Sequence, residues 1–362
     1  MKILILEPYY TGSHKQWAEG YKKYSNHEIE ILSMKGQFWK WRMHGGAVTL
    51  AKQFNNLDYK PDLILSTDML DFSTFLGLTK TESRSVIYFH ENQLSYPWSP
   101  NDRDVIKKRD HHYGFINYAS ALAADFIFFN SKFHMNSFFN DLYPFLKHFP
   151  DYNEIDNIEI IQNKSEVLHL ALELEKFDFF KSTTHNKPLL LWNHRWEYDK
   201  NPEFFFETLK KLKIAGYDFD LIVLGENFSN SPKIFQKAKK IFEDNILHWG
   251  YVKNFDSYAK WLWKANILPV TSYQEFFGVS IMEAIYCETY PVLPNRLSYP
   301  ELIPYQLHKD HYYDNNDQFY DRLKNALIAY KSKDLNSIKN LATKYDWKNL
   351  ASVYDHKLES IL

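Results

Sequence analysis

Short apolar runs alternate with helix-length amphipathic segments along most of the 362-residue chain. Apolar runs between polar boundaries are typical of strands buried on both faces of a parallel sheet. Strands that alternate with helices imply right-handed crossover connections. In the first half we expect strands at residues 2–6, 29–32, 63–66, 86–90 and 126–129, and helices at 13–24, 47–54, 118–123 and 133–145.

The pattern weakens between residues 151 and 187, where charge rises and a short strand at 167–170 precedes the linker. It then restarts, with strands expected at 189–192, 219–224, 246–249, 267–270 and 290–293, and helices at 201–215, 233–243, 255–265 and 279–287. This organisation predicts an α/β fold of two Rossmann-like domains, residues 1–170 and 186–345.

The composition permits a large core and argues against disorder, since 45% of the residues are hydrophobic and 18% are aromatic. With a formal net charge of −2, a polyanion would have to bind through a local patch. The single cysteine, Cys287, excludes an internal disulfide and fits a reducing, cytoplasmic environment. No apolar run approaches the roughly 18 residues of a membrane helix, so we expect no membrane partner.

Ligands of such sheets lie outside the carboxyl ends of the strands, so the residues after each strand are the first candidates. With two domains, we expect both sets to face one another across a cleft. These positions are rich in polar side chains and glycine: Glu7, Tyr9, His90, Glu91, Asn130, Asn193, Arg195, Gly225, Glu226, Gly250, Thr271 and Ser272.

The stretch QEFFGVSIMEA places Glu275 and Glu283 on either side of Gly278. Glycine favours a break, so we expect Glu275 on a loop and Glu283 one turn into a helix that begins near Val279. The free amides of Val279 and Ser280 would suit a diphosphate. Each carboxylate could bind the vicinal hydroxyls of a sugar. The alternative is a loop acid and a helix acid that are both solvated.

The stretch HRWEYDKNPE follows the expected strand at 189–192 and carries Arg195 and Lys200 just before a helix. Two cations there could neutralise a departing diphosphate, one as a fork and the other as a point charge. Alternatively, they are surface ion-pair partners of Glu197 and Asp199.

Two weaker candidates follow strands of the first half. In YYTGSHK, Gly12 permits close backbone approach and Ser13 could cap the next helix, which would suit a phosphate or a sugar. An ordinary strand-to-helix turn is the alternative. In FHENQ, His90 could bond a sugar hydroxyl and Glu91 could orient it, although a lone histidine is more often structural. A His-Glu pair is also a thin metal motif that the other histidines do not complete, so we expect no metal and no other cofactor.

In this order, the features resemble glycosyltransferases of the two-Rossmann-domain (GT-B) type, and Glu275 and Glu283 match the Glu-x7-Glu motif of the retaining, metal-independent family 4. The strings FHENQLSYP, HRWEYDKNPE, ILEPYYTGSHKQW, KWRMH and YPELIP more narrowly resemble the family of tRNA-queuosine alpha-mannosyltransferases, over nearly the whole chain. The chain departs from the animal members in its short linker near residues 171–187. The resemblance also implies that residues 346–362 form a helix that packs back on the N-terminal domain.

The resemblance implies transfer of mannose from GDP-mannose, a sugar nucleotide, to queuosine in tRNA. It assigns catalytic roles to His90, Arg195, Lys200 and Glu275. Glu275 would bind the mannose hydroxyls and Glu283 the ribose, while the two cations and the amides of Gly278 and Val279 would hold the diphosphate. The implied donor site further includes Gly12, Gly225, Glu226, Trp249, Gly250, Tyr251, Phe276 and Phe277, with residues 225–226 and 249–251 flanking the guanine.

An RNA acceptor needs cations and stacking surfaces. Two segments of the N-terminal half mix basic and aromatic residues, KGQFWKWRMH at 35–44 and DRDVIKKRDHHYG at 102–114. Exposed loops with incidental aromatics are the alternative. The residues assigned to the acceptor or RNA are Ser13, His14, Lys15, Lys40, Trp41, Arg42, Glu91, Asn92, Lys107, Lys108, Arg109 and His112.

Two other functions stay open at this level. The same fold could act on a lipid-linked or other glycan acceptor, but such enzymes usually dock on membranes through a basic amphipathic helix, and the N-terminal half shows none. The chain could also be a non-catalytic module that binds a sugar nucleotide or RNA. Local sequence does not fix the base or the sugar of the donor.

Overall fold

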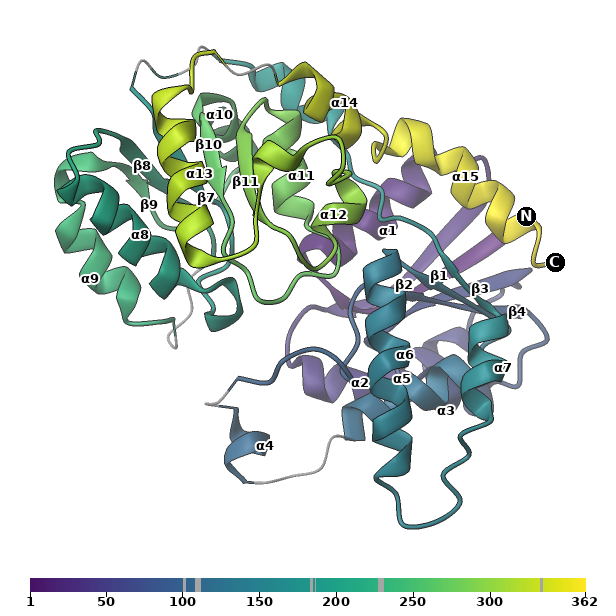
Figure 1. Ribbon diagram of the computed structural model, residues 1–362. Coiled ribbons are helices and arrows are strands. Elements are labelled where there is room, and N and C mark those ends of the chain that lie inside the picture. The colour runs from purple at the N-terminus through teal and green to yellow at the C-terminus, as the bar shows by residue number, and fades with distance from the viewer. Residues whose placement is uncertain (100–101, 108–111, 183–184, 186, 227–230, 333–334) are drawn as a thin grey trace. The chain divides into compact units, whose positions relative to one another are not determined.

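The structure, a computed structural model, describes residues 1–99, 102–107, 112–182, 185, 187–226, 231–332 and 335–362. The chain divides into two compact units (Figure 1). Unit 1 comprises Met1–Glu173 together with Tyr345–Leu362, and unit 2 comprises Leu174–Lys344. Within the described residues, no helix is both long enough and apolar enough to cross a membrane.

Unit 1 contains a six-stranded parallel sheet in the order β2-β1-β3-β4-β5-β6. The order reverses between β1 and β3, which marks a topological switch point where ligands of doubly wound sheets bind. In register, Ile3 pairs with Ile29 on one side and with Leu63 on the other. The strands are β1 (Lys2–Tyr10), β2 (Glu28–Lys35), β3 (Leu63–Thr67), β4 (Arg84–Phe89), β5 (Phe126–Phe129) and β6 (Ser165–Val167).

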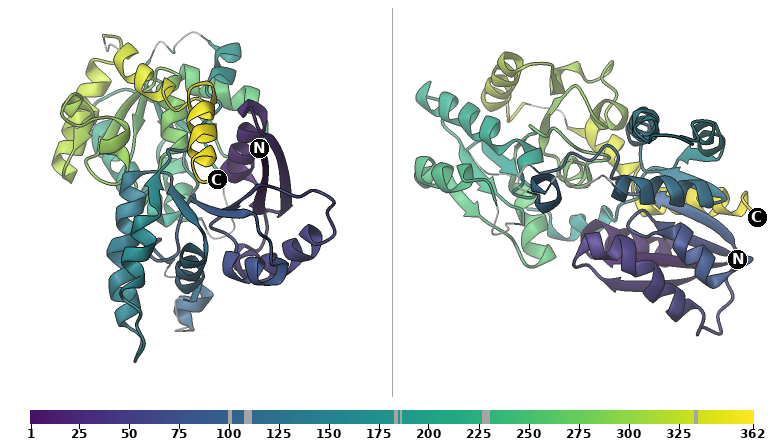
Figure 2. Two further views of the ribbon diagram at one scale, coloured as in Figure 1. Left: turned by 90° about the vertical axis from the view of Figure 1, so that its right-hand side faces the viewer. Right: turned by 90° about the horizontal axis from the view of Figure 1, so that it is seen from below.

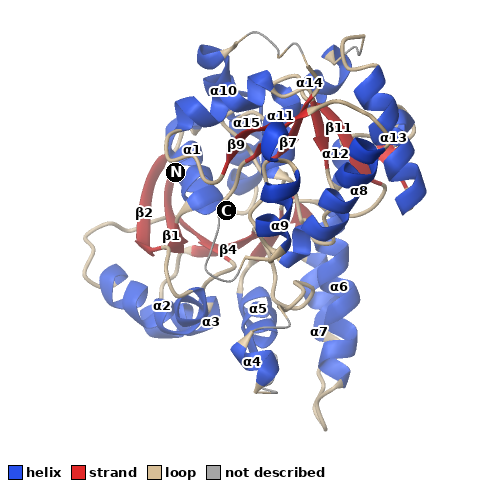
Figure 3. Ribbon diagram, turned by 90° about the vertical axis from the view of Figure 1, so that its left-hand side faces the viewer, coloured by secondary structure: helices blue, strands red, loops and turns tan. Residues whose placement is uncertain are grey.

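Helices cover both faces of this sheet, because its strands are apolar on both sides (Figure 3). One face packs Leu4, Leu6, Ile87 and Phe129 against the group α2, α3, α5, α6 and α7. These helices and the short α4 are α2 (Trp39–Phe54), α3 (Phe72–Thr79), α4 (Arg103–Ile106), α5 (His112–Ala123), α6 (Lys132–Lys147) and α7 (Asn157–Asn163).

Helix α15 (Trp347–Glu359) lies beside α1 (Gly12–Tyr24) in unit 1 (Figure 2, left, yellow and purple). The Trp17 indole N–H donates to the Tyr354 hydroxyl at 3.2 Å, and the Tyr21 hydroxyl donates to Asp355 at 2.9 Å. Gly20 is needed where α1 meets α15, since a Cβ atom there would lie 2.1 Å from the Trp347 indole nitrogen. Residues distant in sequence therefore complete one core.

Unit 2 contains a second six-stranded parallel sheet, in the order β12-β11-β10-β7-β8-β9. This is the strand order of the Rossmann fold, with its switch point between β7 and β10. The strands are β7 (Leu189–Trp192), β8 (Asp220–Val223), β9 (Ile246–Trp249), β10 (Ile267–Pro269), β11 (Tyr290–Pro294) and β12 (Tyr312–Tyr313). The helices are α8 (Pro202–Ile214), α9 (Ile234–Ile241), α10 (Phe255–Lys264), α11 (Val279–Tyr286), α12 (Tyr299–Leu302), α13 (Asn316–Ile328) and α14 (Asn336–Thr343), and single 3₁₀ turns include η1 (Glu175–Phe180) and η2 (Tyr198–Lys200).

The expected α/β fold with two parallel sheets is confirmed, and three local expectations are corrected. Helix α2 begins at Trp39, two turns earlier than expected, so KWRMH is helical rather than a loop. The N-cap of α1 is Thr11, and Ser13 lies inside the first turn, so Ser13 is not the cap. Helices α3, α7, α13 and α14 were not expected. Helices α3, α7 and α14 are short, with seven or eight residues each, whereas α13 carries a helical repeat of buried residues, Phe319, Leu323, Ala326 and Leu327, that was overlooked.

Candidate active site

In unit 2, Lys200 is the central cation at the carboxyl edge of the sheet. Its ammonium donates to the Gln274 carbonyl at 2.8 Å and to Glu275 Oε2 at 3.3 Å, and it lies 3.2 Å from Asp199 Oδ2. Burial disfavours the charged form, but Glu275 and Asp199 outweigh it, so the pKa of Lys200 is raised. The turn that carries Lys200 is fixed because the Thr271 hydroxyl donates to its carbonyl at 2.8 Å. Lys200 therefore stays a cation in a nearly dry site.

Glu275 lies on the loop after β10, and the predicted start of α11 at Val279 is confirmed. Gly278, the residue before the helix, has a φ of 107°, a left-handed conformation that a side chain would strain. This turn brings the loop directly onto the first amides of α11, where no acidic residue occupies the first turn. The helix start, Lys200 and Glu275 thus combine free amides, a cation and a carboxylate, which are groups chemically suited to an anion and to hydroxyl groups.

Glu283 lies one turn into α11 and is 9% exposed. Its Oε2 accepts a hydrogen bond from the Tyr258 hydroxyl of α10 at 2.7 Å. Burial raises the pKa of Glu283, whereas the hydrogen bond from Tyr258 and the charge of Lys176 oppose that shift. At the end of β7, the Asn193 amide donates to the Ser280 carbonyl at 2.6 Å and so ties β7 to α11.

Gly12, which was also expected to bind the donor, is the first residue of α1 in unit 1. The other expected donor residues lie in unit 2, with different exposures. Arg195 Nη1 lies 3.6 Å from Glu197 Oε1, and about half of the Arg195 side chain is exposed. Gly225 is required for packing, since a Cβ atom there would lie 1.9 Å from the His194 carbonyl oxygen. The Glu226 carbonyl accepts the Trp196 amide at 3.0 Å.

Four further donor candidates have aromatic rings. The Trp249 ring packs against Trp196 and Phe206, so it belongs largely to the core edge. Phe276 and Phe277 are buried. Tyr251, after Gly250, is 58% exposed and is the ring among these four that is accessible for stacking.

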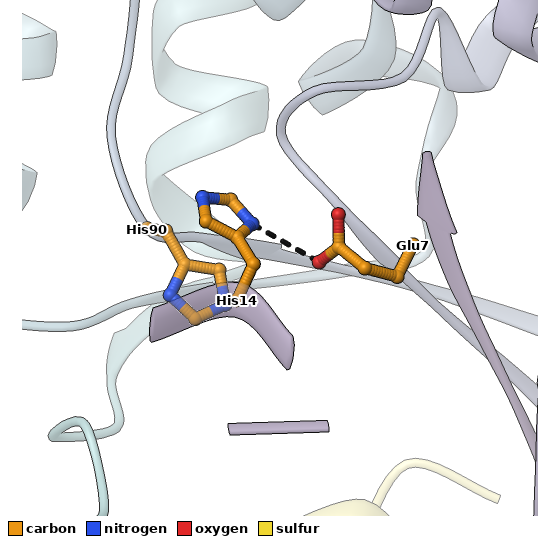
Figure 4. A group of neighbouring side chains, drawn as sticks. All are labelled: Glu7, His14 and His90. Atoms are coloured by element: carbon orange, nitrogen blue, oxygen red, sulfur yellow. Dashed lines mark hydrogen bonds and ion pairs between the residues drawn. The ribbon is translucent and has the colours of Figure 1, made fainter. Parts of the chain in front are cut away.

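In unit 1, Glu7, His14 and His90 come together at the carboxyl edge near the switch point (Figure 4). Glu7 is fully buried; its Oε1 accepts the Tyr9 amide at 2.9 Å and its Oε2 pairs with His14 Nδ1 at 3.0 Å. The ring centroids of His14 and His90 are 4.3 Å apart. Although burial opposes the charge, Glu7 raises the pKa of His14 to about 9, so His14 is a cation at neutral pH.

His90 is held in the opposite protonation state. Burial and the nearby charge of His14 lower its pKa well below the ordinary value, so the ring is neutral. Trp17 and Tyr88 pack edge to face against it, and the Tyr354 hydroxyl of α15 donates to the Tyr88 hydroxyl at 3.1 Å. The Nε2 atom of His90 is buried and has no hydrogen-bond partner among the described residues.

Asp68, which follows β3, holds the chain around His90. Its Oδ1 accepts the His90 amide at 2.7 Å and the Glu91 amide at 3.3 Å. Burial raises the pKa of Asp68 to about 8. Asn92 is buried, and its Oδ1 accepts the amides of Leu94 and Ser95, so this predicted acceptor residue also shapes a turn.

Glu7, His14 and His90 offer three possible metal-ligand atoms within 4.8 Å of one another. The contact of 3.0 Å between Glu7 and His14 is also the distance of a charge-assisted hydrogen bond. A proton shared by these two groups satisfies both of them. The group is therefore an ion pair of Glu7 and His14 beside the neutral imidazole of His90.

Among the residues assigned to the acceptor, the structure gives the cations unequal freedom. Lys40 pairs with Asp102 and Asp104 and lies within 6 Å of the rings of Trp39, Trp98 and Tyr113. Its charge is therefore already balanced inside unit 1.

Among the remaining acceptor candidates, Lys15, Trp41 and Lys107 are exposed, whereas Arg42 and His112 are half-buried. Trp41 is 63% exposed on α2, and the Arg42 Nε donates to the Lys35 carbonyl at 3.1 Å. Lys15 lies 3.7 Å from Glu19, Lys107 is exposed, and His112 Nε2 lies 2.9 Å from His44 Nε2. Lys108 and Arg109 lie outside the described residues.

Sequence reasoning placed Glu7 among the strand-end positions without giving it a role, and it missed Asp68 and Tyr258. The strand-end rule could have selected Asp68, which directly follows β3. Nothing local marks Tyr258, because its importance comes from its contact with Glu283, 25 positions away.

Comparison with known proteins shows which family models and which relatives the chain matches. A family model described as "tRNA-queuosine alpha-mannosyltransferase N-terminal" matches residues 2–172, and one described as "Glycosyl transferases group 1" matches residues 175–343. The tRNA-queuosine alpha-mannosyltransferase of Drosophila melanogaster is 34% identical over 335 residues, which are 89% of this chain and 86% of the relative.

Solved structures share the fold at much lower identity. A glycosyltransferase from Rickettsia africae has a TM-score of 0.68 at 15% identity and covers 99% of this chain and 98% of its own. A sucrose-phosphate synthase from Thermosynechococcus elongatus has a TM-score of 0.72 at 11% identity, and the match covers 100% of this chain and 99% of the synthase. At such identities the likeness establishes the fold alone.

The two doubly wound sheets, with Lys200, Glu275 and the start of α11 at one carboxyl edge, define a GT-B glycosyltransferase. Within that class, the chain belongs to the tRNA-queuosine alpha-mannosyltransferase family.

Proposed function

We propose that this enzyme transfers mannose to the cyclopentene hydroxyl of queuosine at the wobble position of tRNA, with GDP-mannose as the donor. The acceptor and the sugar are the ones in the name of the Drosophila relative, which aligns over 89% of this chain. The observation that carries the chemistry is the meeting of Lys200, Glu275 and the first amides of α11 at one sheet edge.

Unit 2 would bind the donor. A diphosphate carries negative charge, and a buried ammonium together with a helix start is a favourable place for it. Lys200 and Arg195 would hold the diphosphate, Glu275 the mannose hydroxyls, and Glu283 the ribose hydroxyls. The exposed Tyr251 ring is suited to lie against the guanine.

The proposed mechanism retains the configuration of the sugar and uses no metal ion. The bond between the anomeric carbon and the diphosphate oxygen breaks, and the acceptor hydroxyl attacks from the same face. Its proton passes to the departing phosphate oxygen. The protein contributes positions and charge, with Lys200 and Arg195 balancing the leaving group.

Unit 1 would supply the acceptor side and His90. A cationic His14 next to a neutral His90 offers a hydrogen-bond donor beside an acceptor, which suits hydroxyl groups near the reacting carbon. Trp41, Arg42, Lys15 and Lys107 are the accessible stacking and cationic groups proposed to contact RNA.

Incubation of the protein with queuosine-containing tRNA and a panel of sugar nucleotides, followed by nucleoside mass spectrometry, tests the proposal. The expected product is mannosyl-queuosine, formed from GDP-mannose and not from UDP-glucose. Transfer from another donor would overturn the donor assignment. Transfer to a lipid-linked acceptor, together with sedimentation on vesicles, would favour a glycan acceptor. Binding without release of GDP, whichever acceptor is supplied, would favour a non-catalytic module.

A further inference from the structure

Tyr258 is the partner that the chain provides for the buried carboxylate of Glu283. The residue lies on α10, whereas Glu283 lies on α11, and the hydroxyl reaches Oε2 at 2.7 Å. Among the described residues, Oε1 of Glu283 has no hydrogen-bond partner. One oxygen is thus fixed by the protein, and the other is left for a ligand.

We propose that Tyr258 is a positioning residue for nucleotide recognition, which orients the Glu283 carboxylate so that its second oxygen accepts the ribose hydroxyls of the sugar nucleotide. This rests on the proposed function, in which Glu283 binds the ribose. Asn193 lies beside the Tyr258 hydroxyl and also binds the Ser280 carbonyl at 2.6 Å, so the same cluster fixes the first turn of α11.

The electrostatics around Glu283 explain why its carboxylate needs a hydrogen-bond donor such as the Tyr258 hydroxyl. Burial favours the neutral acid, and the groups that face the carboxylate are Tyr258 from α10, Lys176 from η1 and the buried thiol of Cys287, the residue after α11. Burial raises the pKa of Glu283, and the Tyr258 hydrogen bond opposes this rise. Without the hydroxyl, the pKa rises further, so the acid gains a proton as the pH falls. A protonated acid loses the charge that favours hydrogen bonds from two hydroxyls.

The test measures binding of GDP and of 2′,3′-dideoxy-GDP by calorimetry, in the wild type and in Tyr258→Phe, between about pH 6.5 and 8.5. The wild type should prefer GDP with little change across this range. In Tyr258→Phe, the preference should fall by about tenfold at the lower pH and recover as the pH rises, as expected for one hydrogen bond to a charged group. Affinity for the dideoxy nucleotide should not change.

Two control variants separate the possible outcomes. Tyr286→Phe removes a hydroxyl from α11 that donates to Asp178 at 2.8 Å, so it should leave the preference for GDP intact. Glu283→Gln should remove the preference at every pH. An equal loss for both nucleotides in Tyr258→Phe, or a loss independent of pH, overturns the proposal. If the wild type shows no preference and Glu283→Gln changes nothing, the ribose role of Glu283 in the proposed function fails instead.

Discussion

Replacing Glu7 with glutamine should destabilise unit 1 in a pH-dependent way. Glutamine keeps the shape of the side chain and an oxygen for the Tyr9 amide, but its NH₂ group would face His14 Nδ1 and remove the counter-charge. His14 would then have no negative charge from residue 7 to stabilise its protonated form. The substitution therefore isolates the charge of the pair from its packing.

The size of the effect follows from the pKa of His14. A pKa raised from 6.5 to about 9 corresponds to about 3 kcal/mol of preference for the protonated ring in the folded state, an upper figure for a buried pair. Because the folded pKa is the higher one, this stability is fully present below about pH 6.5 and is lost as the pH rises through about 9. The difference between wild type and Glu7→Gln should thus be largest near pH 6 and smallest above pH 9.

Urea unfolding at about pH 6, 7.5 and 9.5 measures this difference, when pulsed hydrogen exchange and mass spectrometry follow peptides from β1 and α1 and so report on unit 1. Glu19→Gln is the matched control, because Glu19 lies on the same helix as His14 but pairs with Lys15 and Tyr10. Its stability difference should be small at every pH. A difference for Glu7→Gln that stays constant or grows with pH would refute the charged pair.

Three further predictions concern the donor site, the core of unit 1 and the acceptor. Lys200→Ala should fold normally but lose about 100-fold or more in kcat for mannosylation of queuosine-containing tRNA, since it removes a cation at the leaving group; near-normal turnover would contradict its role. Gly20→Ala should lower the stability of unit 1 by about 1–3 kcal/mol in thermal denaturation, because the new methyl group collides with Trp347, whereas Gly77→Ala meets nothing within 4 Å and should not. The affinity for tRNA should fall steeply between low and moderate salt in a filter-binding assay, and an unchanged Kd would exclude a phosphate-contacting patch.

Most strands were predictable from sequence because they are short apolar runs between polar residues, proline or glycine. The expected boundaries of β5, β7 and β9 agree with the structure at both ends, although β9 contains His248 and is only partly buried. Helix α3 was not found, because its sequence FSTFLGLT is apolar without a helical repeat. The start of α2 was missed because Gly45 and Gly46 interrupt the helical signal, although Gly46 packs against Pro8 and Leu70 there.

Part of the candidate site was also predictable from sequence, and part was not. Charged residues that follow strands, such as Lys200 and His90, could be selected because the fold brings strand ends to one edge. The state of each group could not be predicted, because it depends on partners far along the chain. Lys200 donates a hydrogen bond to Glu275, which is 75 positions away. Tyr88, whose ring packs against His90, accepts a hydrogen bond from Tyr354, which is 266 positions away.

The return of α15 to unit 1 has a consequence for synthesis of the protein. Unit 1 stays incomplete on the ribosome until Trp347 and Tyr354 have left the exit tunnel, whereas all of unit 2 has been made by then. The part of the chain that is translated first therefore completes its core after unit 2 has been made, and until then the side of α1 that packs on α15 is uncovered.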